Sequence, residues 1–220
     1  MKRIVIFGTK NFAEISHHYF THDSDYTVSA FTVDSPYVKE ATFKGLPVVP
    51  FEEVERQFPP AAYDMFVAVG IQGVNMLRST KVDEAEKKGY RLASFLSSKA
   101  SVNSDLVLRP NTMIMESVWI HPFVEIGRDS IIWSASRIAF HTRIGDHCWI
   151  VSAIFGESVT VGDHSFIGLS ATIAPNVSIG KRNIIGAGAL ILKDTKDFEV
   201  YKGHASTPAR VPSTRLWRRR

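Results

Sequence analysis

The sequence predicts an α/β N-terminal domain followed by a left-handed parallel β-helix. Two observations predict this arrangement. Short apolar runs alternate with helical patterns before residue 95, and an aliphatic residue returns at every sixth position after residue 101. We expect the α/β domain at 1–95, the β-helix at 96–198 and a basic tail at 199–220.

The first part contains three short apolar runs, at 4–7, 28–33 and 65–69, with helical patterns between and after them. This order is typical of a Rossmann-like parallel sheet, in which ligands bind beyond the carboxyl ends of the strands. The turn after the first run has one glycine where the dinucleotide fingerprint requires three, so we do not expect a redox dinucleotide. Its backbone NH groups could hold a phosphate or a nucleobase edge, or the glycine could serve chain reversal alone. The candidate substrate-binding residues are Gly8, Thr9, Lys10, Asp34, Ser35 and Gly70.

The six-residue period fits neither a helix nor an alternating strand, but it fits a solenoid of short strands with three repeats to a triangular coil. We expect the aliphatic residues to stack inside, and the glycines that often follow them to supply permissive corners. One interval, from Ile150 to Phe155, has five residues, so the chain either tightens a corner there or loses its register. The repeated positions are Val102, Leu108, Ile114, Ile120, Ile126, Ile132, Ile138, Ile144, Ile150, Phe155, Val161, Ile167, Ile173, Ile179, Ile185 and Ile191.

Charge and cysteine content narrow the classes of function. The net charge is +4, but six bases and no acids lie in residues 201–220, so the rest of the chain is slightly acidic and we do not expect nucleic-acid binding. Cys148 is the single cysteine, which fits a reducing compartment, and we expect a cytoplasmic protein. We expect no membrane span and no metal site, because no two histidines share a ligand spacing with a carboxylate.

The sequence resembles the hexapeptide-repeat sugar O-/N-acyltransferases of the NeuD/PglD type. The resemblance is carried by IVIFGTKNFAE, FTVDS, MFVAVG, RIAFHTRIGDHCWI and the run from VGDHSFIGLS to ALILKD. It implies transfer of an acetyl group from acetyl-CoA to an amino or hydroxyl group of a nucleotide-linked sugar, in the biosynthesis of a surface glycan such as lipopolysaccharide. It also implies a homotrimer with the site in a cleft between subunits.

The resemblance places the catalytic base of the family at Phe140 and the acidic partner of that base at His141. Our catalytic candidate is therefore His141, which could be a displaced general base, a polar residue that binds substrate or a packed structural residue; the reaction could also need no protein base. We expect Phe140 to contact the acceptor. We expect His121, on an earlier coil, to lie too far from this site to take part.

On the coenzyme side, the resemblance places Trp149 at the position of a second family histidine near the thioester. It places small residues along the pantetheine arm, although the repeat itself could account for the glycines. Because Phe140 replaces the family base, the alternative function is a non-catalytic paralogue that binds a nucleotide sugar or a partner enzyme. The cofactor-binding candidates are Trp149, Leu169, Gly186, Ala187 and Gly188.

Overall fold

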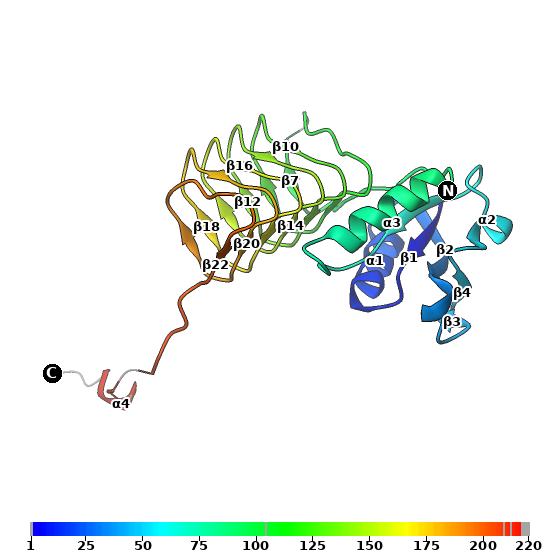
Figure 1. Cartoon of the computed structure of the whole chain (residues 1–220), viewed down its shortest axis with the longest axis horizontal. Helices are drawn as coiled ribbons and strands as arrows, with labels where there is room; N and C mark the ends of the chain where they lie inside the picture. Colours follow the sequence, from blue (N-terminus) through cyan, green and yellow to red (C-terminus); the bar gives the residue numbers. More distant parts are fainter. Residues whose placement is uncertain (1, 104, 209, 212, 217–220) are drawn as a thin grey trace.

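The computed structural model describes residues 2–103, 105–208, 210, 211 and 213–216. An α/β domain lies beside a β-helix, and the C-terminal segment runs away from both as an extended arm that carries the short helix α4 (Ser213–Leu216) (Figure 1). Arg210 and Arg215 lie on this arm, while the final three arginines of the expected basic tail fall outside the described residues.

The α/β domain is built on a five-stranded sheet with the strand order β3-β4-β2-β1-β5. All pairs are parallel except β3 with β4, as expected for a Rossmann-like sheet. Three helices and one 3-10 turn connect the strands. The elements are β1 (Lys2–Phe7), α1 (Asn11–His22), β2 (Tyr26–Val33), η1 (Ser35–Tyr37), β3 (Thr42–Phe43), β4 (Leu46–Pro50), α2 (Val54–Gln57), β5 (Asp64–Val67) and α3 (Met76–Lys87).

Residues 95–201 form the predicted left-handed parallel β-helix, with two-residue strands on three faces. The first face contains β6 (Phe95–Leu96), β8 (Met113–Ile114), β11 (Ile131–Ile132), β14 (Trp149–Ile150), β17 (Phe166–Ile167), β20 (Ile184–Ile185) and β22 (Val200–Tyr201). The second contains β7 (Ser101–Val102), β9 (Trp119–Ile120), β12 (Arg137–Ile138), β15 (Ile154–Phe155), β18 (Thr172–Ile173) and β21 (Leu190–Ile191). The third contains β10 (Glu125–Ile126), β13 (Arg143–Ile144), β16 (Thr160–Val161) and β19 (Ser178–Ile179).

The repeated aliphatic residues fill the interior of the coil. Every one from Ile114 to Ile191 is 4% exposed or less, and burial of each such side chain stabilises the fold by about 1.5 to 3 kcal/mol. The five-residue interval tightens a corner: Ile150 pairs with Ile167 and Ile138 with Phe155, so the aliphatic ladder keeps its register across a coil that is one residue shorter.

The corners differ from our expectation about glycine. The left-handed backbone at the corners is adopted mostly by other residues, among them His141, His147 and His164 with φ of 58 to 60°. The glycines that follow the aliphatic residues instead allow neighbouring coils to approach. A Cβ at Gly162 would lie 2.6 Å from the Lys181 nitrogen of the next coil, a distance that real Cβ atoms do not reach. The repeat therefore uses these glycines for coil stacking.

The first face of the β-helix packs against the α/β domain. The rings of Phe12, Trp133 and Trp149 lie against one another at this junction, with centroids 4.8 to 6.2 Å apart. Polar contacts fix the junction as well, because Asn111 hydrogen-bonds both backbone groups of Val67 at the end of β5. The β-helix thus holds the carboxyl edge of the sheet in one position.

Candidate functional site

Apart from Phe140, the predicted substrate-binding residues lie at the carboxyl edge of the sheet, where β1 lies between β2 and β5. The Gly8 nitrogen donates to the carbonyl oxygen of Thr32 at 2.8 Å, and a Cβ on Gly8 would lie 2.7 Å from the carbonyl oxygen of Ala68. With φ of 126° as well, this position requires glycine. Asp34 follows β2 and Gly70 follows β5, so the structure brings together the three strand ends that the sequence indicated.

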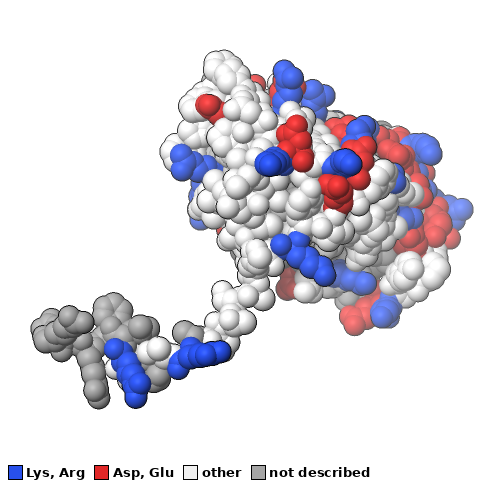
Figure 2. All heavy atoms as spheres, turned by 60° about the vertical axis from the view of Figure 1, so that its left-hand side comes forward, with Lys and Arg blue, Asp and Glu red and all other residues white. Residues whose placement is uncertain are grey.

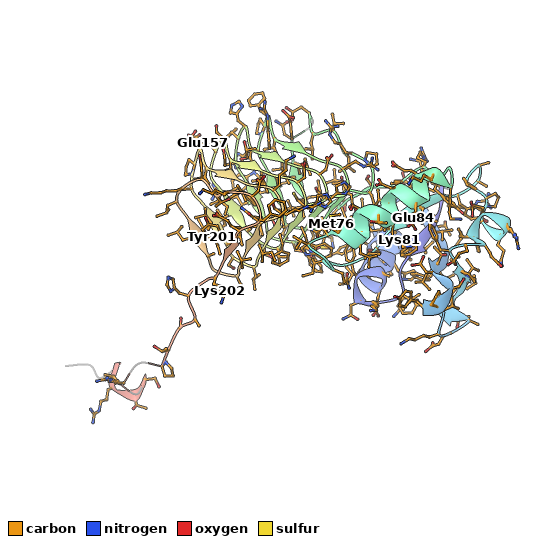
Figure 3. The ribbon with its side chains drawn as sticks, viewed as in Figure 1. Met76, Lys81, Glu84, Glu157, Tyr201 and Lys202 are labelled. Atoms are coloured by element: carbon orange, nitrogen blue, oxygen red, sulfur yellow. The ribbon has the colours of Figure 1, made fainter. Side chains whose placement is uncertain are left out.

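The loops after β2 and β4 and helix α3 form a charged pocket of about 400 Å³ beside this edge. Lys81 Nζ lies 2.7 Å from both Asp34 Oδ1 and Glu84 Oε2. Burial opposes the charge on Lys81, but the two carboxylates outweigh it and raise the pKa of Lys81 above its usual value. Figure 3 shows Lys81 and Glu84 along α3. The pocket is lined by Asp34, Phe51, Glu52, Lys81, Glu84, Lys87 and Lys88.

Ser35 is held in the same loop by a second carboxylate. Its backbone nitrogen and hydroxyl both donate to Glu52, the hydroxyl at 2.7 Å from Oε2. Thr9 is half-buried and Lys10 is exposed at the start of α1, where the described residues supply no side-chain cap to the first turn. The uncapped NH groups of this turn suit a ligand oxygen.

Most of the cofactor candidates lie on one corner of the β-helix, between its first and second faces. Leu169 is exposed, and its carbonyl oxygen accepts a hydrogen bond of 2.8 Å from the Gly188 nitrogen one coil further on. Ala187 is exposed beside it, and the space around the Cβ position of Gly188 is open. Gly186 permits close packing, since a Cβ there would lie 2.9 Å from the carbonyl oxygen of Tyr201.

Trp149 does not belong to this group, and its assignment as a coenzyme contact stays a prediction. It points outward from the first face, is 6% exposed and packs on Phe12 at 4.8 Å between ring centroids, with the Arg78 guanidinium 5.2 Å from its ring. Docking of the α/β domain buries the side chain. Sequence alone could not show this, because the repeat only indicates that the residue points outward.

The catalytic candidate lies at a different corner, between the second and third faces. His141 is exposed and its ring stacks on Phe123, with centroids 4.8 Å apart and an 11° angle between planes. Phe140 is 39% exposed and contacts His121, whose ring centroid is 4.3 Å away. The expectation that His121 is too distant is therefore wrong, because vertical stacking places successive coils side by side.

Within one chain the structure does not bring the two corners together. Glu157, one coil beyond Phe140 at the equivalent position, lies on the opposite edge of the β-helix from Tyr201 and Lys202, which continue the coenzyme-candidate edge (Figure 3). His141 and Ala187 therefore face different directions. A site that uses both requires corners from two chains.

A buried polar cluster connects α3 with the β-helix, and no sequence pattern predicted it. Arg78 Nε lies 2.8 Å from Asp129 Oδ1, with both side chains fully buried. A second guanidinium nitrogen donates to the carbonyl oxygens of Asp129, His147 and Cys148. Asn111 and His147 also contact the Asp129 carboxylate, at 2.7 and 2.8 Å. This cluster fixes the start of α3, next to the loop that carries Gly70.

Surface charge differs between the body of the molecule and the C-terminal arm. Figure 2 shows basic and acidic side chains intermixed over the visible face of the body and basic side chains on the arm. Among the described residues no three His, Cys, Asp or Glu side chains are grouped as a metal site would require. None of the helices in the described part of the chain is long and apolar enough to span a membrane.

Sequence comparisons find the repeat. Residues 158–193 match the bacterial transferase hexapeptide family model, described as six repeats. The bifunctional protein GlmU of Heliobacterium modesticaldum is 30% identical over 122 residues, covering 47% of this chain and 25% of GlmU. The putative acetyltransferase YvoF of Bacillus subtilis is 27% identical over 110 residues, covering 50% of this chain and 58% of YvoF. The chain thus spans between a quarter and about three fifths of these relatives.

Solved structures match both parts of the chain. A single-substitution variant of perosamine N-acetyltransferase from Caulobacter crescentus, in complex with CoA and GDP-perosamine, has a TM-score of 0.81 and 25% identity, covering 92% of this chain and 94% of that one. The acetyltransferase domain of PglB from Neisseria gonorrhoeae shares the fold, with a TM-score of 0.82, 18% identity and coverage of 95% and 100%. The chain therefore carries the bacterial transferase hexapeptide repeat, and its resemblance to the hexapeptide-repeat sugar acyltransferases is confirmed.

Proposed function

We propose that this protein transfers an acetyl group from acetyl-CoA to an amino or hydroxyl group of a nucleotide-linked sugar, in the cytoplasmic biosynthesis of a surface glycan. The observation that carries the proposal is the match over 92% of the chain to an N-acetyltransferase whose structure contains both CoA and GDP-perosamine. The match includes the α/β domain as well as the β-helix, so it covers the acceptor candidates and the donor candidates together.

The carboxyl edge of the sheet supports the acceptor half of the proposal. Gly8 lets backbone approach closely, and the uncapped first turn of α1 offers NH groups to a phosphate. Lys10 adds a positive charge at the same turn. Asp34 and Ser35 stand at the neighbouring strand end, where their polar groups can bind a sugar or base. We place the nucleotide-linked sugar here.

The corner of Leu169 and Ala187 supports the donor half. Exposed small side chains and an open Gly188 leave room for a pantetheine arm along the coil. Because this corner and that of His141 face different directions in one chain, the complete site requires a second copy. The second face presents apolar side chains for such contact, with Trp119, Ile154 and Leu190 between 46% and 61% exposed. We propose a homotrimer with the site between neighbouring subunits.

In the reaction the acceptor nitrogen or oxygen attacks the thioester carbonyl carbon. A new C–N or C–O bond forms, the C–S bond breaks, and the electron pair leaves on sulfur as the CoA thiolate. A general base takes the acceptor proton, which then protonates the thiolate. The assignment of this role to His141 stays a prediction. Its exposed ring on Phe123 can equally contact hydroxyl groups of the sugar.

Phe140 favours a second candidate function. An apolar ring at the position of the family base is compatible with a non-catalytic paralogue that binds a nucleotide sugar or a partner enzyme without transferring an acyl group. This candidate predicts acceptor binding without acetyl-CoA turnover.

Calorimetric titration with acetyl-CoA tests the proposal first. We expect binding to the wild-type protein and loss of binding in Ala187→Trp, whose indole fills the proposed pantetheine path. Thr160→Trp, which adds the same side chain to the third face, is the matched control and keeps binding. CoA release in the presence of amino-sugar nucleotides then measures transfer. Absence of acetyl-CoA binding to wild type would refute the proposed enzyme and favour the paralogue.

A further inference from the structure

His121 occupies an unusual environment at the corner between the second and third faces. Its ring stacks on Trp119, with centroids 4.7 Å apart, and contacts the Phe140 ring at 4.3 Å. Phe140 belongs to the next coil, at the position where the resemblance places the catalytic base. His121 is therefore the imidazole that contacts the residue at this position.

The Nε2 atom of His121 is buried and has no hydrogen-bond partner among the described residues. An unpaired buried nitrogen costs about 1 to 3 kcal/mol, so its retention calls for an explanation. The aromatic rings of Trp119 and Phe140 provide no conventional partner for this nitrogen. A substrate N–H or O–H group that approaches the corner would supply the missing donor.

We propose that His121 is the general base of the transfer reaction. It lies one coil before Phe140, which occupies the position of the family base, and takes over the role of that base. The inference rests on the proposed function. His121 Nε2 accepts the proton of the acceptor amine or hydroxyl as the new bond to the acetyl carbon forms. The imidazolium then returns that proton to the CoA thiolate, so the histidine ends the cycle neutral. The acceptor displaces the Phe140 ring to reach Nε2.

His141 is placed less favourably for this role. Its ring lies on Phe123 and is open to solvent, one corner position beyond Phe140. Other ionisable groups on the coils next to His121 are Asp105 on one side and Arg137 and His141 on the other, and the Arg137 guanidinium lies 4.9 Å from the Trp119 ring.

The test compares His121→Gln with the matched control His22→Gln, an exposed histidine in the last turn of α1, in the full chain, with acetyl-CoA and GDP-perosamine as the probe acceptor. We expect His121→Gln to lower kcat by about 100-fold or more and to remove the ascending limb of the kcat against pH profile. The KM for acetyl-CoA and its calorimetric affinity should not change, which also checks folding. His22→Gln should retain kcat within about threefold and keep the limb.

Two further results separate the possible failures. If wild type transfers acetyl groups and His121→Gln retains both kcat and the pH limb, the base assignment is overturned while the proposed function stands. If the wild-type protein releases no CoA, the proposed acetyl transfer fails as well. The ring NMR signals of labelled histidine then report on acceptor binding independently of turnover. Addition of GDP-perosamine should shift the His121 signal, and an unchanged signal would overturn the acceptor contact as well.

Discussion

Replacement of Arg78 by methionine tests how the two parts of the protein are held together. The variant keeps an unbranched chain but removes every donor of the guanidinium. Among the described residues, the Asp129 carboxylate then keeps its contacts with Asn111 and His147, while the carbonyl oxygens of His147 and Cys148 lose their shared donor. Removal of one partner from a fully buried ion pair costs about 3 to 5 kcal/mol, because the remaining charge stays buried without compensation.

Urea unfolding followed by tryptophan fluorescence measures this loss, since the Trp149 ring lies 5.2 Å from the guanidinium. With a slope of about 3 kcal/mol per molar urea, the midpoint should fall by about 1 to 1.7 M. The control is Arg143→Met, which breaks an exposed pair with Glu125 and should cost about 1 kcal/mol or less. A midpoint for Arg78→Met equal to that of the control would refute the stabilising role of the buried pair.

Two further predictions concern stability. Gly162→Ala should lower stability by about 1 to 3 kcal/mol, because the added Cβ meets the backbone of the next coil. Gly188→Asn should lower stability less, because Gly188 has open space around it and a φ that Asn tolerates. Equal losses of the two variants in thermal melts would contradict the role of Gly162 in coil stacking. Burial opposes ionisation of Glu116, but hydrogen bonds from Tyr19 and Ser134 outweigh it and lower its pKa below 4.5. The stabilisation is therefore present above pH 4.5 and is lost as the pH falls below it. In Glu116→Gln, Tm should depend less on pH between about 3 and 5. A Tm that depends on pH as steeply as in the wild type would show that Glu116 does not contribute to this stabilisation.

The six-residue repeat was enough to predict the β-helix from the sequence alone. Each repeat presents one aliphatic residue to the interior, so burial of these positions follows from local periodicity and does not depend on distant contacts. The same holds for the strand ends at Gly8, Asp34 and Gly70, because adjacent parallel strands place their carboxyl ends at one edge. Even the short interval after Ile150 was visible as an irregularity, although the choice between a tight corner and a lost register required the structure.

Only the tertiary structure decided which outward-facing residues are accessible and which lie together. Periodicity indicates that Trp149 points out of the coil, but the docked α/β domain buries it against Phe12. Coil stacking brings His121 against Phe140, which lies 19 positions later in the sequence. The ion pair between Arg78 and Asp129 joins a helix to a corner of the β-helix, and no sequence pattern predicts it. Hydrophobic periodicity is a local property of the chain, whereas paired polar groups and domain contacts depend on residues far apart in sequence.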